Sequence, residues 1–255
     1  MKSSAKILQN EISKAQRILD KELANKSYLK VLEVGCGSCS RLHIAQNKNM
    51  VGIDISEKQL QRNNTLNEKI QGDIQSYNFP ESSFDLIVCW WILEHLPQPE
   101  KALLNCQKAL KEDGIIIIAS PNVFSLKGII TKYTPHWFHV WSYRFIFGQQ
   151  LAGIEDRAPF RTFLKSSISA AAIKKFAQDN ELSVEYFSPY ESPKQMRLRK
   201  TYFVTGFLWS SIKSITRLLS LGTIDAENTE YIAILKKTTN QHKTPSDKAL
   251  ETIAV

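Results

Sequence analysis

The sequence predicts an α/β protein with a doubly wound parallel sheet and helices on both faces. Three observations lead to this prediction. Short apolar runs alternate with segments of helical periodicity between residues 28 and 122. The runs at residues 84–90 and 115–120 are almost continuously apolar, which is typical of central parallel strands covered on both faces. The first run leads into a Gly-x-Gly turn, Gly35-Cys36-Gly37, as at a ligand-binding edge of such a sheet.

Each element has its own signal along the chain. An amphipathic helix within residues 3–25 has apolar residues at helical spacing, and we expect it on the core or over the ligand pocket. Ser56-x-x-Gln59 has the pattern of a capping box at a helix start. The apolar runs predict strands at 28–34, 50–55, 69–73, 84–90, 115–120, 182–189 and 231–235. Further helices are predicted at 40–47, 57–68, 99–110 and 166–180.

The order of these elements suggests a division of the chain. Residues 1–27 form the N-terminal helix and 28–122 the ligand-binding core. Residues 123–165 are aromatic and basic, too hydrophobic for a solvated loop, so we expect a lid that folds over something. Residues 166–237 complete the sheet and contain a basic amphipathic insert at 194–222, and residues 238–255 form a polar, flexible tail.

Composition and charge limit the class of protein. The chain has 255 residues, 43% hydrophobic and 23% charged, which suffices for one large α/β domain. The net charge is +8, and residues 123–150 and 192–224 together hold nine basic residues and no acid, so the remainder carries −1. Such a placement favours an anionic partner, namely a membrane surface, a phosphorylated substrate or a nucleic acid.

Targeting signals and cysteines point to a reducing compartment. Residues 1–10 lack an apolar signal core, and no run of 18 uncharged apolar residues occurs, so we expect a cytoplasmic protein. Cys36-x-x-Cys39 has the spacing of a metal or redox motif, but no second cysteine pair or nearby histidine completes a zinc set. We therefore interpret these cysteines as small residues that fill a tight turn, and we expect no metal.

The second strand ends in a carboxylate, Asp54, 17 residues after Gly37. A carboxylate at that place can accept hydrogen bonds from both hydroxyls of a ribose. Asp54 could instead cap the following helix, but Ser56 suits that role better.

These motifs together resemble the class I S-adenosylmethionine-dependent methyltransferases. The resemblance covers about residues 28–122, and the matching stretches keep their order and spacing. They are Leu32-Glu33-Val34-Gly35-Cys36-Gly37, Gly52-Ile53-Asp54-Ile55-Ser56, Gly72-Asp73-Ile74, Phe79-Pro80 with Ser83 to Val88, Leu93-Glu94-His95-Leu96, and Leu110 to Gly114. The third glycine of the dehydrogenase fingerprint is absent, which disfavours a dinucleotide enzyme. The resemblance implies a Rossmann-like, seven-stranded, mostly parallel sheet.

The resemblance also implies which residues bind S-adenosylmethionine. Glu33, Gly35, Cys36 and Gly37 would line the methionine part, and Asp54 would bind the ribose hydroxyls. Ile55, Asp73 and Ile74 would surround the adenine, with Asp73 accepting from the amino group. Cys89 and Trp90, at the end of the fourth predicted strand, would approach the methionine portion.

A catalytic base is harder to assign. His95 follows the fourth predicted strand, where substrate meets cofactor; the alternative is that it only shapes the pocket, since Glu94-His95-Leu96 is common in the family that the sequence resembles. His136 and His139 are alternatives that would share one helix face, or they are merely packed among aromatic residues. The similar ubiquinone-pathway O-methyltransferases carry Glu-x-x-Glu-His for a metal. Here Trp91 stands at the first of these positions, which argues against a metal site.

The insert at 194–222 suggests where the protein works. Aromatic and aliphatic residues share one predicted helix face among basic residues, which suits an anionic membrane interface. Packing on the sheet or on a second subunit, as a homodimer, remains the alternative. We therefore expect methyl transfer to a hydroxyl of a small hydrophobic or lipid-linked acceptor by a cytoplasmic, peripheral membrane protein. The alternatives are an RNA or protein methyltransferase and a non-catalytic binding protein, and no nucleic-acid partner is expected.

Overall fold

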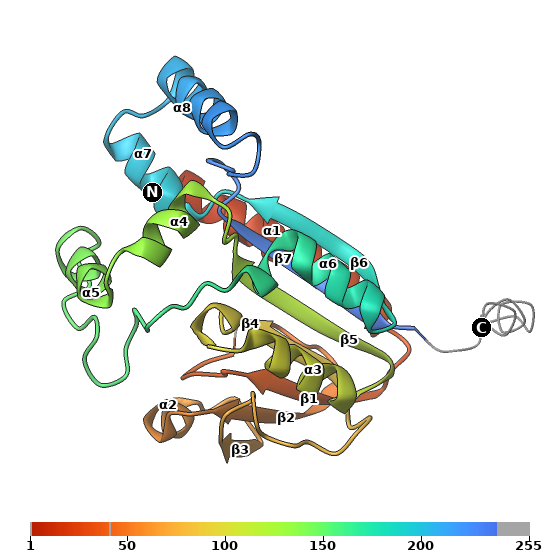
Figure 1. The fold of residues 1–255 in the computed structure, drawn as a ribbon. Helices are drawn as coiled ribbons and strands as arrows, with labels where there is room; N and C mark the ends of the chain where they lie inside the picture. The colour runs from red at the N-terminus through yellow and green to blue at the C-terminus, as the bar shows by residue number, and fades with distance from the viewer. Residues whose placement is uncertain (1, 41, 239–255) are drawn as a thin grey trace, which may run out of the picture.

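A computed structural model describes residues 2–40 and 42–238 and contains a seven-stranded sheet (Figure 1). The strand order is β3-β2-β1-β4-β5-β7-β6. All neighbouring pairs are parallel except those of β7, which runs antiparallel to β5 and β6. The predicted fold class is confirmed. The strands are β1 Tyr28–Val34, β2 Asn47–Asp54, β3 Glu68–Gln71, β4 Phe84–Trp90, β5 Leu110–Pro121, β6 Leu182–Tyr190 and β7 Glu230–Lys237.

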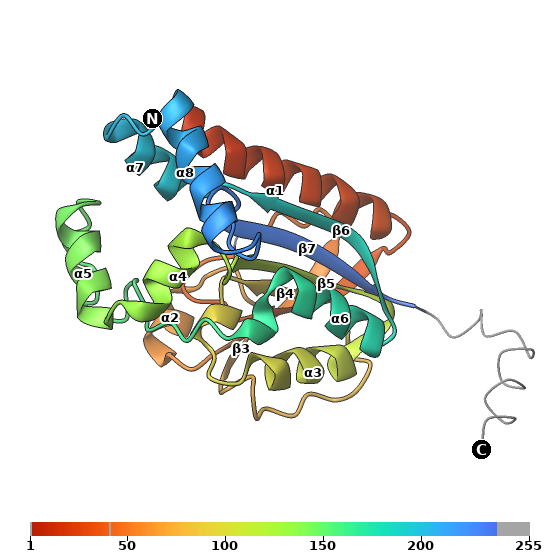
Figure 2. The same cartoon turned by 45° about the horizontal axis from the view of Figure 1, so that its top comes forward.

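Helices cover both faces of this sheet (Figure 2). Helix α1, Lys2–Glu22, packs Ala15 and Leu19 against one face, joined by Leu23 directly after the helix, whereas α3, Pro99–Ala109, and α6, Ala170–Asp179, cover the other. The remaining helices are α2 Glu57–Arg62, α4 Leu126–Tyr133, α5 His136–Phe145, α7 Pro193–Thr201 and α8 Gly206–Leu219, with 3₁₀ turns at Leu93–His95 and Ser166–Ile168.

The core lies around β4 and β5, because both strands are enclosed between helical layers. All seven residues of β4 are buried, and Ile115 to Ala119 of β5 are fully buried. Each buried aliphatic side chain contributes about 1.5–3 kcal/mol relative to an exposed one. This central pair therefore fixes the edge where the carboxyl ends of β1, β2, β4 and β5 meet.

The predicted helix at 40–47 is wrong. The described residues of this stretch, 40 and 42–46, are irregular, and β2 already begins at Asn47. The whole connection from β1 to β2, residues 35–46, is at the lower limit of about a dozen residues for a crossover between parallel strands, and the glycine turn already takes its first three residues.

The predicted helix at 57–68 is shorter than expected, because α2 ends at Arg62. Asn63 takes an extended backbone there, and its buried side chain donates to Cys36 O and Gly37 O. Tertiary contact with the glycine turn thus outweighs continuation of the helix. The predicted helix at 166–180 likewise begins late, at Ala170, because the Ser169 side chain accepts from Ala172 N–H at 3.2 Å and caps it.

The two atypical segments are helical in part. Residues 123–165 contain α4, α5 and a long loop, and residues 194–222 contain most of α7 and all of α8. The lid function of the first segment stays a prediction. Among the described residues, no helix is both long enough and apolar enough to cross a membrane. The predicted tail at 238–255 lies, apart from Thr238, outside the described residues.

Candidate functional site

The glycine turn closes the carboxyl end of β1 against the end of β2. Gly35 N–H donates to Ile53 O at 2.8 Å, and Gly35 and Gly37 have φ of +60° and +55°. Glycine is needed at position 35 for space as well, since a Cβ there would lie 2.4 Å from Ile92 Cδ1. The turn therefore brings bare backbone to the edge of the sheet, where a ligand can approach closely.

Asp54 stands beside this turn with its carboxylate fixed by two backbone groups. Gly37 N–H donates to Oδ2 and Ser56 N–H to Oδ1, both at 2.9 Å. Each oxygen keeps a second lone pair, so the pair can still accept from neighbouring hydroxyls of a ribose. The next residue, Ile55, is 74% exposed, an open apolar surface suited to one side of a flat ring.

Asp73 and Ile74 follow β3 on the other side of Ile55. The Asp73 carboxylate accepts from the Gln75 backbone N–H at 2.9 Å and from the Gln75 side-chain amide. Gln75 is in turn held through Gln98 N–H, which donates to its Oε1 at 2.8 Å. Ile74 is buried and forms part of the core beneath the site.

Glu33 and Cys36 line the inner side of the turn. Glu33 is buried and accepts from the Ser40 hydroxyl, which also bonds with the Thr65 hydroxyl at 2.7 Å. Burial, and then the charges of Asp54 and Glu33, raise the pKa of the Cys36 thiol to about 12. Cys36 is thus a protonated thiol at neutral pH, which disfavours a redox or metal role for it.

The end of β4 supplies the far wall. Cys89 and Trp90 are buried, and Trp91 has a positive φ of 53°. Left-handed backbone at a bulky residue is a conformation that neighbouring structure must impose, and such positions cluster at ligand sites. Here Trp91 N–H bonds to Ala119 O at 2.8 Å, which bends the chain into the 3₁₀ turn that carries Glu94 and His95.

His95 is held in one orientation by the segment 123–165. Its Nδ1 lies 2.7 Å from the carbonyl oxygen of Arg161, so this nitrogen carries the proton and Nε2 is left as the acceptor. The ring packs edge-on against Phe160. Burial lowers the pKa of His95, which favours the neutral ring.

The two other candidate histidines lie beside one cavity. This cavity has a volume of about 200 Å³ and includes Arg161, whose carbonyl oxygen contacts His95. His139 Nε2 lies 3.0 Å from the Thr134 hydroxyl, and His136 is exposed. The cavity is lined by Lys132, Thr134, Pro135, His136, His139, Arg161 and Thr162.

Sequence reasoning missed a group of buried polar side chains beyond His95. Glu94 and Tyr190 are buried, and each has a side-chain oxygen without a hydrogen-bond partner. Glu230 accepts from Lys127 Nζ at 2.8 Å. Burial and the Glu230 charge raise the pKa of Glu94 to about 8, and burial followed by the Glu230 charge raises that of Tyr190. Glu230 is more than 100 positions from both Glu94 and Lys127 in the sequence, so no local sequence pattern could have predicted that these residues lie together.

The loop at 150–158 contacts the start of α2, next to Asp54 at the end of β2. Asp156 accepts from the Ser56 hydroxyl at 2.8 Å, and its backbone carbonyl accepts from the Gln59 side chain. Arg62 donates to Glu155 O at 3.0 Å. The segment 123–165, which also contains His136, His139 and the Arg161 that contacts His95, thus contacts α2 next to Asp54.

Comparisons with known proteins agree with this arrangement. Residues 32–118 match the family described as a methyltransferase domain. The ubiquinone biosynthesis O-methyltransferase of Idiomarina loihiensis is 28% identical over 184 residues, covering 65% of this chain and 75% of that protein. An uncharacterized protein of Methanocaldococcus jannaschii is 33% identical over 109 residues, covering 43% of this chain and 48% of that one. The chain thus spans about half the length of this archaeal relative.

A solved structure supports the fold. The S-adenosylmethionine dependent methyltransferase from Mesorhizobium loti superposes with a TM-score of 0.50 and 13% identity, covering 88% of this chain and 96% of that one. The fixed Asp54 carboxylate, the exposed Ile55 and the bare glycine turn fit the ribose, adenine and methionine parts of S-adenosylmethionine. The chain therefore carries a class I S-adenosylmethionine-dependent methyltransferase domain, whose cofactor is S-adenosylmethionine.

Proposed function

We propose that this chain transfers a methyl group to a hydroxyl of a small hydrophobic or lipid-linked acceptor. The observation that carries the proposal is the orientation of His95. Its Nδ1–H donates to Arg161 O, so Nε2, which lies 3.9 Å from Glu94 Oε1, is the nitrogen that can accept a proton, and the lowered pKa of the ring favours the neutral form. A hydroxyl acceptor needs such a group, because its oxygen becomes a good nucleophile only as its proton leaves.

The residues of the site have separate roles in this reaction. S-adenosylmethionine, when bound, supplies a methyl group on a positively charged sulfur. Asp54 and the glycine turn would hold the cofactor, and His95 Nε2 would take the proton from the acceptor oxygen as that oxygen forms its bond to the methyl carbon and the bond from this carbon to sulfur breaks. The segment 123–165 covers the reacting atoms and excludes water, while its aromatic residues provide an apolar environment for the acceptor.

Two further observations support an oxygen acceptor of this kind. The relative from Idiomarina loihiensis is by name an O-methyltransferase of ubiquinone biosynthesis. Exposed aromatic residues, Tyr133 and Trp137, are next in sequence to the cavity-lining residues Lys132, Thr134 and His136. Neither the RNA nor the protein alternative has a comparable observation in its favour.

The test uses a catechol bearing an isoprenoid chain, offered with S-adenosylmethionine. We expect S-adenosylhomocysteine to form, and we expect none when both hydroxyls are already methylated. In His95→Asn, the amide nitrogen can keep the hydrogen bond to Arg161 O but no base remains. We therefore expect kcat to fall by about 10²–10⁴-fold with an unchanged Kd for S-adenosylmethionine.

A matched control is His139→Asn, whose imidazole lies beside the cavity and bonds to Thr134. This variant should keep kcat within a few-fold of the parent. An unchanged kcat in His95→Asn would refute the role of His95. Turnover with RNA or protein, and none with hydroxyl compounds, would refute the proposed acceptor class.

A further inference from the structure

Helix α8 presents an unusually apolar outward face. No residue of the helix is buried, and its large side chains are mostly open to solvent. Phe207 is 89% exposed, Leu218 75% and Leu219 80%. At 100° per residue these positions, with Leu208 and Ile215, fall on one side of the helix. Soluble monomers rarely expose so much contiguous apolar surface, so this face calls for a partner.

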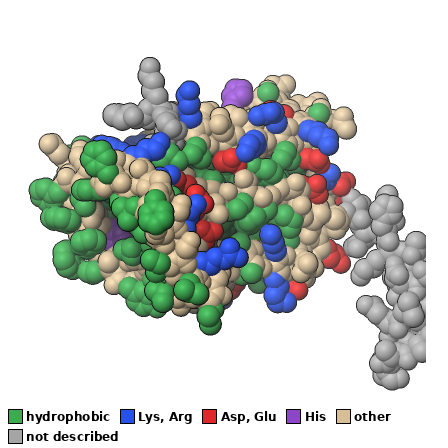
Figure 3. Space-filling view, turned by 90° about the horizontal axis from the view of Figure 1, so that it is seen from above, with side chains coloured by type: hydrophobic (Ala, Val, Ile, Leu, Met, Phe, Trp, Pro, Cys, Tyr) green, Lys and Arg blue, Asp and Glu red, His purple; other side chains and the backbone are tan. Residues whose placement is uncertain are grey.

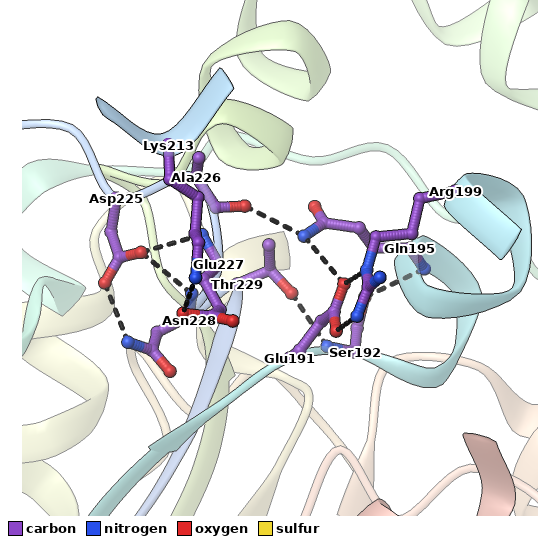
Figure 4. A network of polar contacts seen from close by, with 10 residues as sticks. All are labelled: Glu191, Ser192, Gln195, Arg199, Lys213, Asp225, Ala226, Glu227, Asn228 and Thr229. Atoms are coloured by element: carbon purple, nitrogen blue, oxygen red, sulfur yellow. Dashed lines mark hydrogen bonds and ion pairs between the residues drawn. The ribbon is translucent and has the colours of Figure 1, made fainter. Parts of the chain in front are cut away.

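The opposite side of α8 carries Trp209 and Lys213, which contact neighbouring segments; Figure 4 shows Lys213 beside Glu227 and Arg199 against Glu191. Arg199 forms two hydrogen bonds with the Glu191 carboxylate, at 2.6 and 2.9 Å, and lies 5.1 Å from the Trp209 ring. Lys213 pairs with Glu227 at 3.0 Å. Because these contacts hold the inward side, the exposure of the other side is a built feature of the fold.

The loop after α8, residues 225–228, also holds this helix in place. Asp225 Oδ1 accepts from the backbone N–H groups of Glu227 and Asn228, and Gln195 donates to Ala226 O at 2.8 Å (Figure 4). The segment after α8 is thereby joined to α7. The α7–α8 hairpin consequently has one defined orientation relative to β6 and β7.

Helix α5 adds a second stripe at the same end of the molecule (Figures 1 and 3). Trp137, Trp141 and Phe145 recur every four residues and are 69%, 45% and 72% exposed. Lys194 links α7, the helix before α8, to α5, because its ammonium lies 3.9 Å from the Tyr143 ring of α5. The exposed apolar residues of α5 and α8 therefore lie at the same end of the molecule, and together they are called here the α5–α8 surface.

Exposed basic side chains lie on α8 itself and on α4 and α7, the helices that precede α5 and α8 in the chain. Lys132, Arg197 and Arg217 are exposed, and residues 123–150 and 192–224 contain no acid. An apolar face rich in Trp and Phe, bordered by Lys and Arg, matches the boundary between acyl chains and anionic headgroups. Docking on an uncharged protein partner would require the apolar face but not the basic residues around it.

We propose that the α5–α8 surface docks on an anionic lipid bilayer. Phe207, Leu218 and Leu219 of α8 enter the boundary between headgroups and acyl chains together with the exposed α5 aromatics. Arg197 and Arg217 contact the lipid phosphates. The helices lie in the plane of the surface, in keeping with the finding that no described helix can cross a membrane. This docking does not depend on the identity of the methyl acceptor.

Vesicle flotation tests the proposal with the full chain and no substrate. We expect the protein to float with vesicles of phosphatidylcholine mixed with phosphatidylglycerol, to stay unbound with phosphatidylcholine alone, and to be released by high salt. The variant Phe207→Ser/Leu218→Ser/Leu219→Ser should bind at least tenfold more weakly, and Arg197→Gln/Arg217→Gln should lose the preference for phosphatidylglycerol. Leu104→Ser, at a 40% exposed position of α3, is the matched control and should bind like the parent.

Because every substituted side chain is exposed, we expect all variants to fold, and circular dichroism melts check this. The proposal is overturned if the parent does not float, or if the folded triple variant floats as well as the parent. It is also overturned if light scattering shows a dimer that the triple variant abolishes without a change in vesicle binding, because a second copy would then cover the face.

Discussion

Substitution of Gly35 by alanine tests the geometry of the glycine turn. Two costs add at this position. The backbone has φ of +60°, where an L-residue loses about 1–2 kcal/mol, and the new Cβ would lie 2.4 Å from Ile92 Cδ1 and 2.5 Å from Cγ1. Forcing that contact in a packed site costs about 1–3 kcal/mol. We therefore expect Gly35→Ala to lower the free energy of unfolding by about 2–5 kcal/mol.

The matched control is Gly148→Ala. Gly148 has φ of +70°, but a Cβ there would meet no atom within 4 Å. Only the backbone cost applies, so we expect a loss of about 1–2 kcal/mol. Urea unfolding followed by circular dichroism measures both values through the midpoint, at constant m.

A double variant separates the two costs at Gly35. Ile92→Ala removes the Cδ1 and Cγ1 atoms that the new Cβ would contact. The loss of unfolding free energy in Gly35→Ala/Ile92→Ala should therefore be smaller than the sum of the losses in the two single variants, by a coupling energy of about 1 kcal/mol or more. Equal losses in Gly35→Ala and Gly148→Ala, together with zero coupling, would refute the steric explanation of the turn.

Three other predictions follow from the site. Asp54→Asn should weaken S-adenosylmethionine binding by at least tenfold in calorimetry, because a charged acceptor contributes about 1.5–3 kcal/mol per hydrogen bond; an unchanged Kd would contradict the assigned ribose contact. Burial raises the pKa of Glu94 to about 8, so the folded state retains a proton that the unfolded chain releases near its ordinary pKa of 4.5. Stability should therefore fall as pH rises from about 4.5 to 8, and thermal melts of Glu94→Gln should show a flatter decline; an identical slope would argue against a protonated Glu94. Finally, a thiol reagent at pH 8 should modify Cys39 first, since Cys39 is exposed while Cys36, Cys89 and Cys106 are buried; mass spectrometry that finds Cys36 modified faster would be inconsistent with its pKa of about 12.

The strands were predictable because burial on both faces leaves a strong local signal. The run from Phe84 to Trp90 is apolar at almost every position, and all of it is buried. Cofactor-side residues such as Gly35 and Asp54 were predictable for a related reason, since a turn and a carboxylate at strand ends have a fixed place in a parallel sheet.

Other features depend on contacts that no local pattern encodes. Residues 40–47 have a composition compatible with a helix, but the short path from Gly37 to Asn47 leaves little room for one. Asn63 ends α2 early because it bonds to the glycine turn 26 residues before it. The pairing of His95 with Arg161, 66 residues away, and of Lys127 with Glu230 could be seen only once the chain was folded.

The position of β7 in the sheet has a consequence for synthesis of the chain. β7 is the last strand among the described residues, yet it lies between β5 and β6 and pairs with both. Until residues 230–237 leave the ribosome, the edge of β5 from Ile115 to Ile118 has no partner on that side. An unpaired apolar edge of this kind is a template for association with other chains. A nascent chain that stalls before β7 would thus be a natural target for chaperones, and aggregation should increase sharply on deletion of that strand.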